Sequence, residues 1–249
     1  MNTKFKYNKL NFPMLVSGDL HAPYVHKHYL SFLMETEAKY KAKSIVFCGD
    51  EVDYHALSRH TSEPECDGVI TELEKAKDVL AGYVGVFPKA VITVGNHSQI
   101  PIRQAKEMGI PRSFLRSAND LLNLPKEWEF VPYIVYNGIY IDHGRSIAKD
   151  AAINTAISKR MSYVQGHQHS WANVKYHANE DNIIFGMSVG CGIDNTAYAF
   201  AYGKQFVNKP ILSCGVILSP TQAYVEVMNP DKYDKKKCGK NVNKHGRKR

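Results

Sequence analysis

Five polar clusters, each placed directly after a short apolar run, constrain this chain more than any other feature. They are Asp19-Leu20-His21, Gly49-Asp50-Glu51-Val52-Asp53, Gly95-Asn96-His97, Asp142-His143-Gly144 and Gly166-His167-Gln168-His169. Short apolar runs bounded by glycine and polar residues are typical of buried strands. Ligand sites of α/β folds gather at the carboxyl ends of such strands. We therefore expect the five clusters to contribute to one site.

The first half of the chain alternates expected strands with expected helices. Strands are expected over residues 13–17, 44–48 and 90–94, and helices over residues 25–42, 69–86, 99–108 and 113–122. The second half is richer in strand patterns, over residues 130–136, 139–142, 162–164, 183–187, 214–218 and 223–228, with one helix over residues 147–160. Asn137-Gly138 is a strong signal for a hairpin turn. This layout predicts sheets with helices on the outside.

The composition fits a single large domain over residues 1–230. The chain has 249 residues, of which 44% are apolar, so it can bury a sizeable core. There is no apolar run of about eighteen residues and no apolar signal-peptide segment behind the polar start, so we expect no membrane contact and a cytoplasmic location. The five scattered cysteines include no Cys-x-x-Cys pair, which favours free thiols over a disulfide framework or structural zinc.

Residues 231–249 form a strongly basic C-terminal tail. They hold nine Lys and Arg and two Asp, a net charge of +7, whereas the first 230 residues hold 23 basic and 22 acidic residues. One interpretation is an arm that gathers polyanions such as nucleic acid. The other is a solvated, flexible terminus without a partner. The sequence leaves both open.

Seven side chains of the clusters are candidate metal ligands: Asp19, His21, Asp50, Asn96, His143, His167 and His169. Two carboxylates, one amide oxygen and four imidazoles suit manganese, iron, zinc or nickel better than calcium. Seven ligands exceed the need of one transition metal, whereas two ions about 3.5–4 Å apart that share a carboxylate would use them. Each cluster alone has an ordinary explanation, such as a helix cap or a turn. The five together favour a metal site.

In this order the clusters resemble the motifs of the calcineurin-like metallophosphoesterase superfamily, over residues 19–169. The resemblance implies a four-layer α/β/β/α sandwich, in which two mixed β-sheets are flanked by helices. It implies that Asp19, His21 and His169 hold one metal ion. It implies that Asn96, His143 and His167 hold the other and that Asp50 bridges the two. A hydroxide between the metals would then attack the phosphorus, and no covalent enzyme intermediate is expected.

The resemblance also implies catalytic roles for two residues beside the ligands. His97 matches a histidine that protonates the leaving oxygen or stabilises the transition state. Asp53 matches a carboxylate that orients this histidine in several members of the family.

Two positions depart from the family pattern. Ser98 stands where many members have an acid, and Tyr54 stands where protein phosphatases have an arginine that grips phosphate. The second departure argues against a Ser/Thr protein phosphatase. Candidate substrate contacts are His55, Arg59 and Arg145, with Arg103 as a further replacement for the arginine.

These features predict a hydrolase that cleaves phosphate esters at a dinuclear metal centre, with manganese as the expected metal. The missing phosphatase arginine and the basic tail favour a phosphodiesterase, such as a nuclease, acting on nucleic acid or nucleotides. A phosphomonoesterase acting on nucleotides or other small phosphate esters is the alternative. A non-catalytic nucleic-acid-binding scaffold is the alternative of another class. Such a scaffold would be expected to have lost ligands, and all seven are present.

Overall fold

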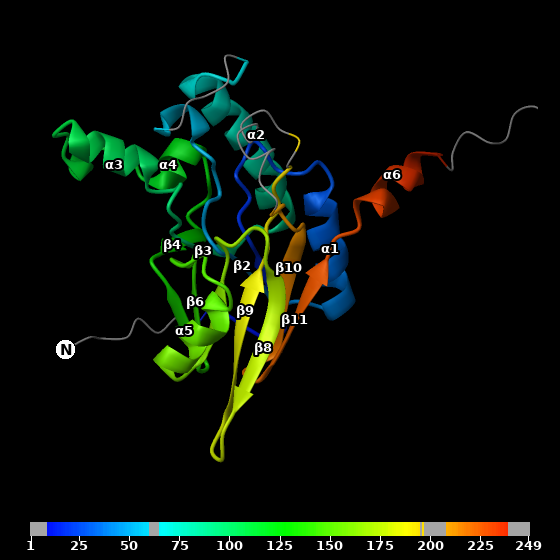
Figure 1. Ribbon diagram of the computed structural model, residues 1–249. Coiled ribbons are helices and arrows are strands. Elements are labelled where there is room, and N and C mark those ends of the chain that lie inside the picture. The colour runs from blue at the N-terminus through cyan, green and yellow to red at the C-terminus, as the bar shows by residue number, and fades with distance from the viewer. Residues whose placement is uncertain (1–8, 60–64, 195, 197–207, 239–249) are drawn as a thin grey trace, which may run out of the picture.

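The chain forms two β-sheets that pack against each other, with helices on the outer face of each sheet (Figure 1). The computed structural model describes residues 9–59, 65–194, 196 and 208–238. Two mixed sheets with flanking helices form the four-layer α/β/β/α arrangement that the resemblance implied, so the fold prediction is confirmed.

The first sheet has six strands. Their order is β11 (Gln222–Val227), β10 (Ser213–Ser219), β1 (Met14–Ser17), β2 (Ser44–Phe47), β3 (Ala90–Thr93) and β4 (Trp128–Val131). Strands β1 to β4 are parallel, whereas β10 pairs antiparallel with both β1 and β11. The carboxyl ends of β1, β2 and β3 therefore lie at the same end of this sheet.

The second sheet has five strands. Their order is β5 (Ile134–Tyr136), β6 (Ile139–Asp142), β7 (Ser162–Gln165), β9 (Ile183–Val189) and β8 (Ala172–Ala178). Strands β6, β7 and β9 are parallel, and the edge strands β5 and β8 are antiparallel to their neighbours.

The inner strands β1, β2 and β3 of the first sheet are buried on both faces, which explains their continuous apolar sequences. In β1, Met14 and Val16 belong to the core shared with the second sheet, and Leu15 belongs to the core beneath the helices. In β2, Val46 faces the second sheet and Phe47 faces the helices. Successive side chains of a strand point to opposite faces, so one strand contributes to both cores.

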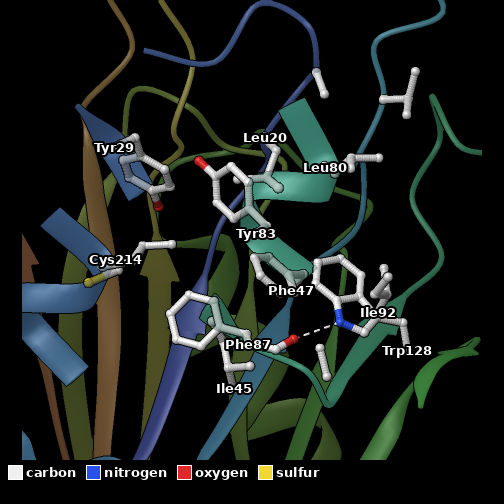
Figure 2. Close-up of a cluster of buried hydrophobic side chains, with 14 of the residues drawn as sticks. Leu20, Tyr29, Ile45, Phe47, Leu80, Tyr83, Phe87, Ile92, Trp128 and Cys214 are labelled. Atoms are coloured by element: carbon white, nitrogen blue, oxygen red, sulfur yellow. Dashed lines mark hydrogen bonds between the residues drawn. The ribbon is translucent and has the colours of Figure 1, made fainter. Parts of the chain in front are cut away.

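Helices α1 (Tyr29–Tyr40) and α2 (Val69–Val86) cover the first sheet, and α5 (Ala151–Lys159) covers the second. Figure 2 shows the aromatic core below α2, where Phe47 stacks on Trp128 with 5.1 Å between ring centroids. The Trp128 indole N–H donates a hydrogen bond of 2.8 Å to the carbonyl oxygen of Phe87. This bond satisfies the buried indole and holds the end of α2 against β4.

The expected strand over residues 130–136 is in fact two strands in different sheets. Strand β4 ends at Val131 and belongs to the first sheet, whereas β5 begins at Ile134 in the second. Pro132 between them has no N–H to donate, so ladder pairing stops there and the chain crosses over. The expected hairpin is present, and both Asn137 and Gly138 have positive φ, at 45° and 77°. Such angles are those of the turns that connect hairpin strands.

The expected helix over residues 113–122 is also wrong. Helix α3 (Ile100–Glu107) is followed by the 3-10 turn η2 (Arg112–Phe114) and the short helix α4 (Ala118–Leu122). Ser117 begins α4, because its hydroxyl accepts a hydrogen bond of 3.1 Å from the backbone N–H of Asp120. The 3-10 turn η1 (His55–Leu57) lies between β2 and α2. Edge strand β8 was not expected, since its sequence has no apolar run.

The basic tail begins with a helix. Helix α6 (Pro230–Cys238) follows β11, and its Tyr233 is buried and donates a hydrogen bond of 3.0 Å to Glu35 of α1. The first turn of α6 therefore contacts α1, through Tyr233 and through Lys232, which also bonds to Glu35. Residues 239–249 lie outside the described part. No helix among the described residues combines the length and the apolar character that crossing a membrane requires.

Candidate metal centre

All five polar clusters meet where strands of both sheets end. Asp19 and His21 follow β1, Asp50 and Asp53 follow β2, and Asn96 and His97 follow β3 in the first sheet. His143 follows β6 and His167 and His169 follow β7 in the second. The hydrogen bonds and ion pairs described below join these loops to one another, so one cluster spans the junction of the two sheets.

Tight loop geometry brings the side chains together. His21, Asp50 and His167 have left-handed backbone angles, with φ of 51°, 47° and 61°. Residues other than glycine rarely adopt such angles, and the strain is typical of functional sites. Gly95 and Gly166 let the backbone lie close to the two carboxylates. A Cβ atom on Gly95 would lie 2.0 Å from Asp50 Oδ1, and one on Gly166 would lie 2.3 Å from Asp19 Oδ1.

One group of candidate ligands surrounds Asp19. Its Oδ2 atom lies 2.7 Å from Nε2 of His169 and 3.8 Å from Nε2 of His21. Nε2 of His21 also lies 4.0 Å from Oδ2 of Asp50. Asp19, His21 and His169 thus present ligand atoms close enough to share one ion.

A second group surrounds Nε2 of His143. This atom lies 2.8 Å from Oδ1 of Asn96, 3.1 Å from Nδ1 of His167 and 3.2 Å from Oδ2 of Asp50. The same Oδ2 atom of Asp50 therefore faces both groups. Every one of the seven predicted ligands lies in one of the two groups.

The hydrogen bonds behind the rings test whether the two groups fit a metal ion. Nδ1 of His143 lies 2.7 Å from the carbonyl oxygen of Cys48, which can only accept, so Nδ1 carries the proton. Nδ1 of His21 is hydrogen-bonded in the same way to Oδ1 of Asp53. Once these rings lose their Nε2 protons, the bare Nε2 lone pairs point toward carboxylate oxygens that also lack protons. Divalent cations satisfy such converging lone pairs, and these residues fit them.

Charge inside the cluster is strongly coupled. Asp19 is fully buried, which opposes ionisation, yet His143 and His169 hold the pKa of its carboxyl well below the usual range. Burial opposes protonation of His143, but the carboxylates of Asp19 and Asp50 raise its pKa to about 9. Protons thus compensate the buried carboxylates when no metal does, and metal binding must displace them.

His97 and Asp53 form the next shell of contacts. Nδ1 of His97 donates to the carbonyl oxygen of Asp53 at 2.5 Å and lies 3.3 Å from its carboxylate. The Asp53 carboxylate also accepts from His21, so it contacts a candidate ligand and the candidate catalytic histidine at once. Burial and the neighbouring His21 lower the pKa of His97. The side chains of His97 and His169 are 26% and 31% exposed, so the cluster opens on their side.

The predicted substrate contacts lie at different places. His55 is buried, with Nδ1 3.9 Å from Asp53, and lies behind the cluster. Arg59 is exposed and lines a cavity next to His97. Arg145 is exposed on the loop after His143 and makes no hydrogen bond or ion pair to the cluster residues described.

Some supporting groups were not predicted. The carbonyl of Cys48 fixes the His143 ring, and Ser98 donates a hydrogen bond of 2.7 Å to Glu51. Burial raises the pKa of Glu51 to about 7. The role of the Cys48 carbonyl could not be predicted, because every residue has a backbone carbonyl. For the Ser98–Glu51 pair, the sequence showed only that each residue stands next to a residue of a motif.

Comparisons with known proteins are sparse. The chain matches no protein-family model and no curated protein sequence. Vacuolar protein sorting 29 from Cryptosporidium parvum is 14% identical, with a TM-score of 0.45 over 87% of this chain and 91% of that one. The phosphoesterase YfcE from E. coli is 15% identical, with a TM-score of 0.42 over 87% and 99%. The nuclease MPE from Pseudomonas putida is 10% identical, with a TM-score of 0.30 over 86% of each chain.

These similarities concern the fold and are too weak to carry a function. Independently of them, the chain has the two mixed sheets, the outer helices and the ligand cluster at the strand ends. The architecture is therefore the four-layer fold that the sequence resemblance implied.

Proposed function

We propose that this chain is a hydrolase that cleaves phosphate esters with two divalent metal ions. The observation that carries the proposal is the position of Asp50, whose Oδ2 atom faces both ligand groups. A carboxylate between two sites is the arrangement that a two-metal centre needs.

The side chains divide the work as follows. Asp19, His21 and His169 would hold one ion, Asn96, His143 and His167 the other, and Asp50 both. Ions bound there would lower the pKa of a water molecule and neutralise charge on the phosphate oxygens. The buried hydrogen bonds of His143 and His21 hold the rings in the tautomer that binds metal.

His97 is the proposed acid for the leaving oxygen. Its Nδ1 proton is held by the carbonyl of Asp53, so Nε2 is the atom that can carry a proton toward the substrate. Its lowered pKa makes the protonated ring a stronger acid than an ordinary histidine.

Phosphodiesters are the proposed substrates, on nucleic acid or nucleotides. Tyr54, at the position of the phosphatase arginine, is 8% exposed and packs in the core beneath the helices. It offers no cation to grip the terminal oxygens of a phosphomonoester. A phosphomonoesterase with a cation from another element is the second candidate, and manganese is the proposed metal.

The decisive experiment compares hydrolysis of bis-p-nitrophenyl phosphate with that of p-nitrophenyl phosphate. The protein is first freed of metal by chelation and then given Mn²⁺. Turnover that needs the metal and is lost in Asp50→Asn supports the proposal, and the preferred ester distinguishes a diesterase from a monoesterase. Asp78→Asn, a change of an exposed carboxylate on α2, is the matched control.

A non-catalytic scaffold predicts a different result. Bound metal without turnover on either ester, across Mn²⁺, Zn²⁺, Ni²⁺ and Fe²⁺, would contradict the proposed hydrolase. Metal analysis of the purified protein distinguishes two kinds of scaffold. One still binds metal without turnover, and the other has lost the site and contains no metal.

A further inference from the structure

A cavity of about 440 Å³ opens directly beside the candidate metal centre. Its lining includes Asn96 and His97 at the inner end, with residues of the loop after η1 and of α3 farther out. The volume lies within the range of small-molecule sites. Because Asn96 is a candidate ligand and His97 the proposed acid, the cavity and the candidate metal centre share these two residues.

Arg103 of α3 is an exposed cation that lines this cavity. Its Nη2 donates a hydrogen bond of 3.2 Å to the carbonyl oxygen of Asn96, which holds the guanidinium near the centre. Among the described residues no acidic side chain pairs with it. A guanidinium has five N–H donors, so most remain available for an anion. Arginine forks suit phosphate oxygens in particular.

The second arginine of the cavity is neutralised. Arg59 forms an ion pair with Glu107 at the outer rim, where their side chains are 73% and 48% exposed. Gln104 of α3 donates to the carbonyl of Leu57 at 3.2 Å and so fixes the helix against η1. Arg103 therefore supplies the cavity's uncompensated positive charge at a position set by packing.

The position of the cavity says which part of a substrate it would hold. His97 lines it and, in the proposed function, protonates the leaving oxygen. The portion of the substrate beyond that oxygen must then extend into the cavity. No Phe, Tyr or Trp is among the described residues that line it. The guanidinium of Arg103 is the charged group that this cavity offers to an anion.

We propose that Arg103 binds a second phosphate on the leaving portion of a phosphodiester substrate, as the next phosphate of a nucleic acid strand would provide. This inference rests on the proposed function and deepens it. It makes Arg103 a substrate-binding residue that favours strand phosphodiesters over isolated ones, without selecting a base. In this proposal the phosphate-binding arginine comes from α3, far in sequence from Tyr54, which stands where protein phosphatases have theirs.

The test compares two dinucleotides that differ only in their terminal phosphates. One is thymidylyl-thymidine, and the other carries a phosphate at both ends, so that cleavage in either direction leaves a phosphate on the departing nucleoside. The wild-type protein should prefer the phosphorylated dinucleotide in kcat/KM by about tenfold or more, the gain of a charge-assisted contact. Arg103→Gln should reduce this ratio to about one, and Arg103→Lys should restore part of it.

Lys106→Gln is the matched control, since Lys106 is an exposed cation on the same helix outside the cavity lining. It should leave the ratio unchanged. A wild-type ratio near one would overturn the proposal, as would an equal loss on both dinucleotides in Arg103→Gln.

A binding measurement separates this inference from the proposed function. Absence of any turnover on bis-p-nitrophenyl phosphate would count against the hydrolase and not against the arginine. Calorimetric titration with thymidine 3′,5′-bisphosphate needs no turnover. Arg103→Gln should weaken its binding by about tenfold relative to wild type and Lys106→Gln. Equal affinities in all three proteins would overturn the assignment of Arg103.

Discussion

The His143 ring donates its Nδ1 proton to the carbonyl oxygen of Cys48 across 2.7 Å, and this bond fixes the candidate metal centre. His143 follows β6 of the second sheet and Cys48 follows β2 of the first, so the bond joins the two sheets at their carboxyl ends. With Nδ1 engaged, Nε2 is the ring nitrogen that faces Asn96, His167 and Asp50. Packing of the two sheets therefore sets the ligand geometry.

Asp53→Asn should weaken metal binding as well as turnover. The Asp53 carboxylate accepts the Nδ1 proton of His21, a candidate ligand, and lies 3.3 Å from Nδ1 of His97. Loss of such a partner typically weakens metal affinity about 10–100-fold. Calorimetric titration of the metal-free protein with Mn²⁺ checks this, with Asp78→Asn as control. A loss of turnover with unchanged Mn²⁺ affinity would mean that Asp53 acts through His97 alone.

The sequence predicted the ligand cluster because each ligand follows a strand, and a short apolar run in the sequence is enough to recognise such a strand. It could not predict which partner Asp53 takes. The resemblance pointed to His97, whereas the carboxylate also accepts from His21. That contact joins the loop after β1 to the loop after β2, and no local sequence pattern encodes it.

Other features depend on tertiary packing that no local pattern encodes. The apolar run through residues 130–136 has no mark of a change of sheet except Pro132. The sequence also named Arg59, Arg103 and Arg145 without ranking them. Only the packing of α3 against η1, through Gln104 and the carbonyl of Leu57, brings Arg103 beside Asn96.

His97→Ala should affect substrates according to their leaving groups. A thymidine alkoxide needs a proton to leave, so thymidylyl-thymidine cleavage should fall by about 10²–10⁴-fold, the usual contribution of a positioned acid. p-Nitrophenolate leaves without one, so bis-p-nitrophenyl phosphate should lose much less. Steady-state rates on both esters check this, with His177→Ala, an exposed histidine of β8, as control. Equal losses on the two esters would assign His97 to binding or to general charge stabilisation.

Glu51→Gln should stabilise the metal-free protein increasingly as pH rises. Glu51 is 2% exposed, and burial raises its pKa to about 7. In the unfolded chain the Glu51 carboxyl ionises near its ordinary pKa. The free energy of unfolding therefore falls as pH rises from about 4.5 to about 7, and it stays lower at higher pH. Glutamine does not titrate, so the advantage of the variant should grow to about 2–3 kcal/mol by pH 8.

Denaturant unfolding at pH 5 and pH 8, in the presence of a chelator, measures this difference. Glu180→Gln, a change of an exposed carboxylate, should show no such pH dependence. A Glu51→Gln advantage that is the same at both pH values would contradict the raised pKa. Unchanged stability at both would mean that the Ser98 hydroxyl compensates the buried charge in full.

Removal of residues 239–249 should separate polyanion binding from turnover. These residues hold five Lys and Arg, whereas residues 230–238 form α6, which Tyr233 anchors to α1, so the cut leaves the described body intact. Affinity for a single-stranded oligonucleotide should fall, and the slope of its logarithm against the logarithm of salt should become shallower by about 0.7 for each lost phosphate contact. Turnover of bis-p-nitrophenyl phosphate should persist, because that substrate reaches the metals without the tail. A full-length variant with the five cations changed to glutamine should behave like the truncation if charge is the cause. Unchanged affinity and slope would instead favour a terminus without a partner.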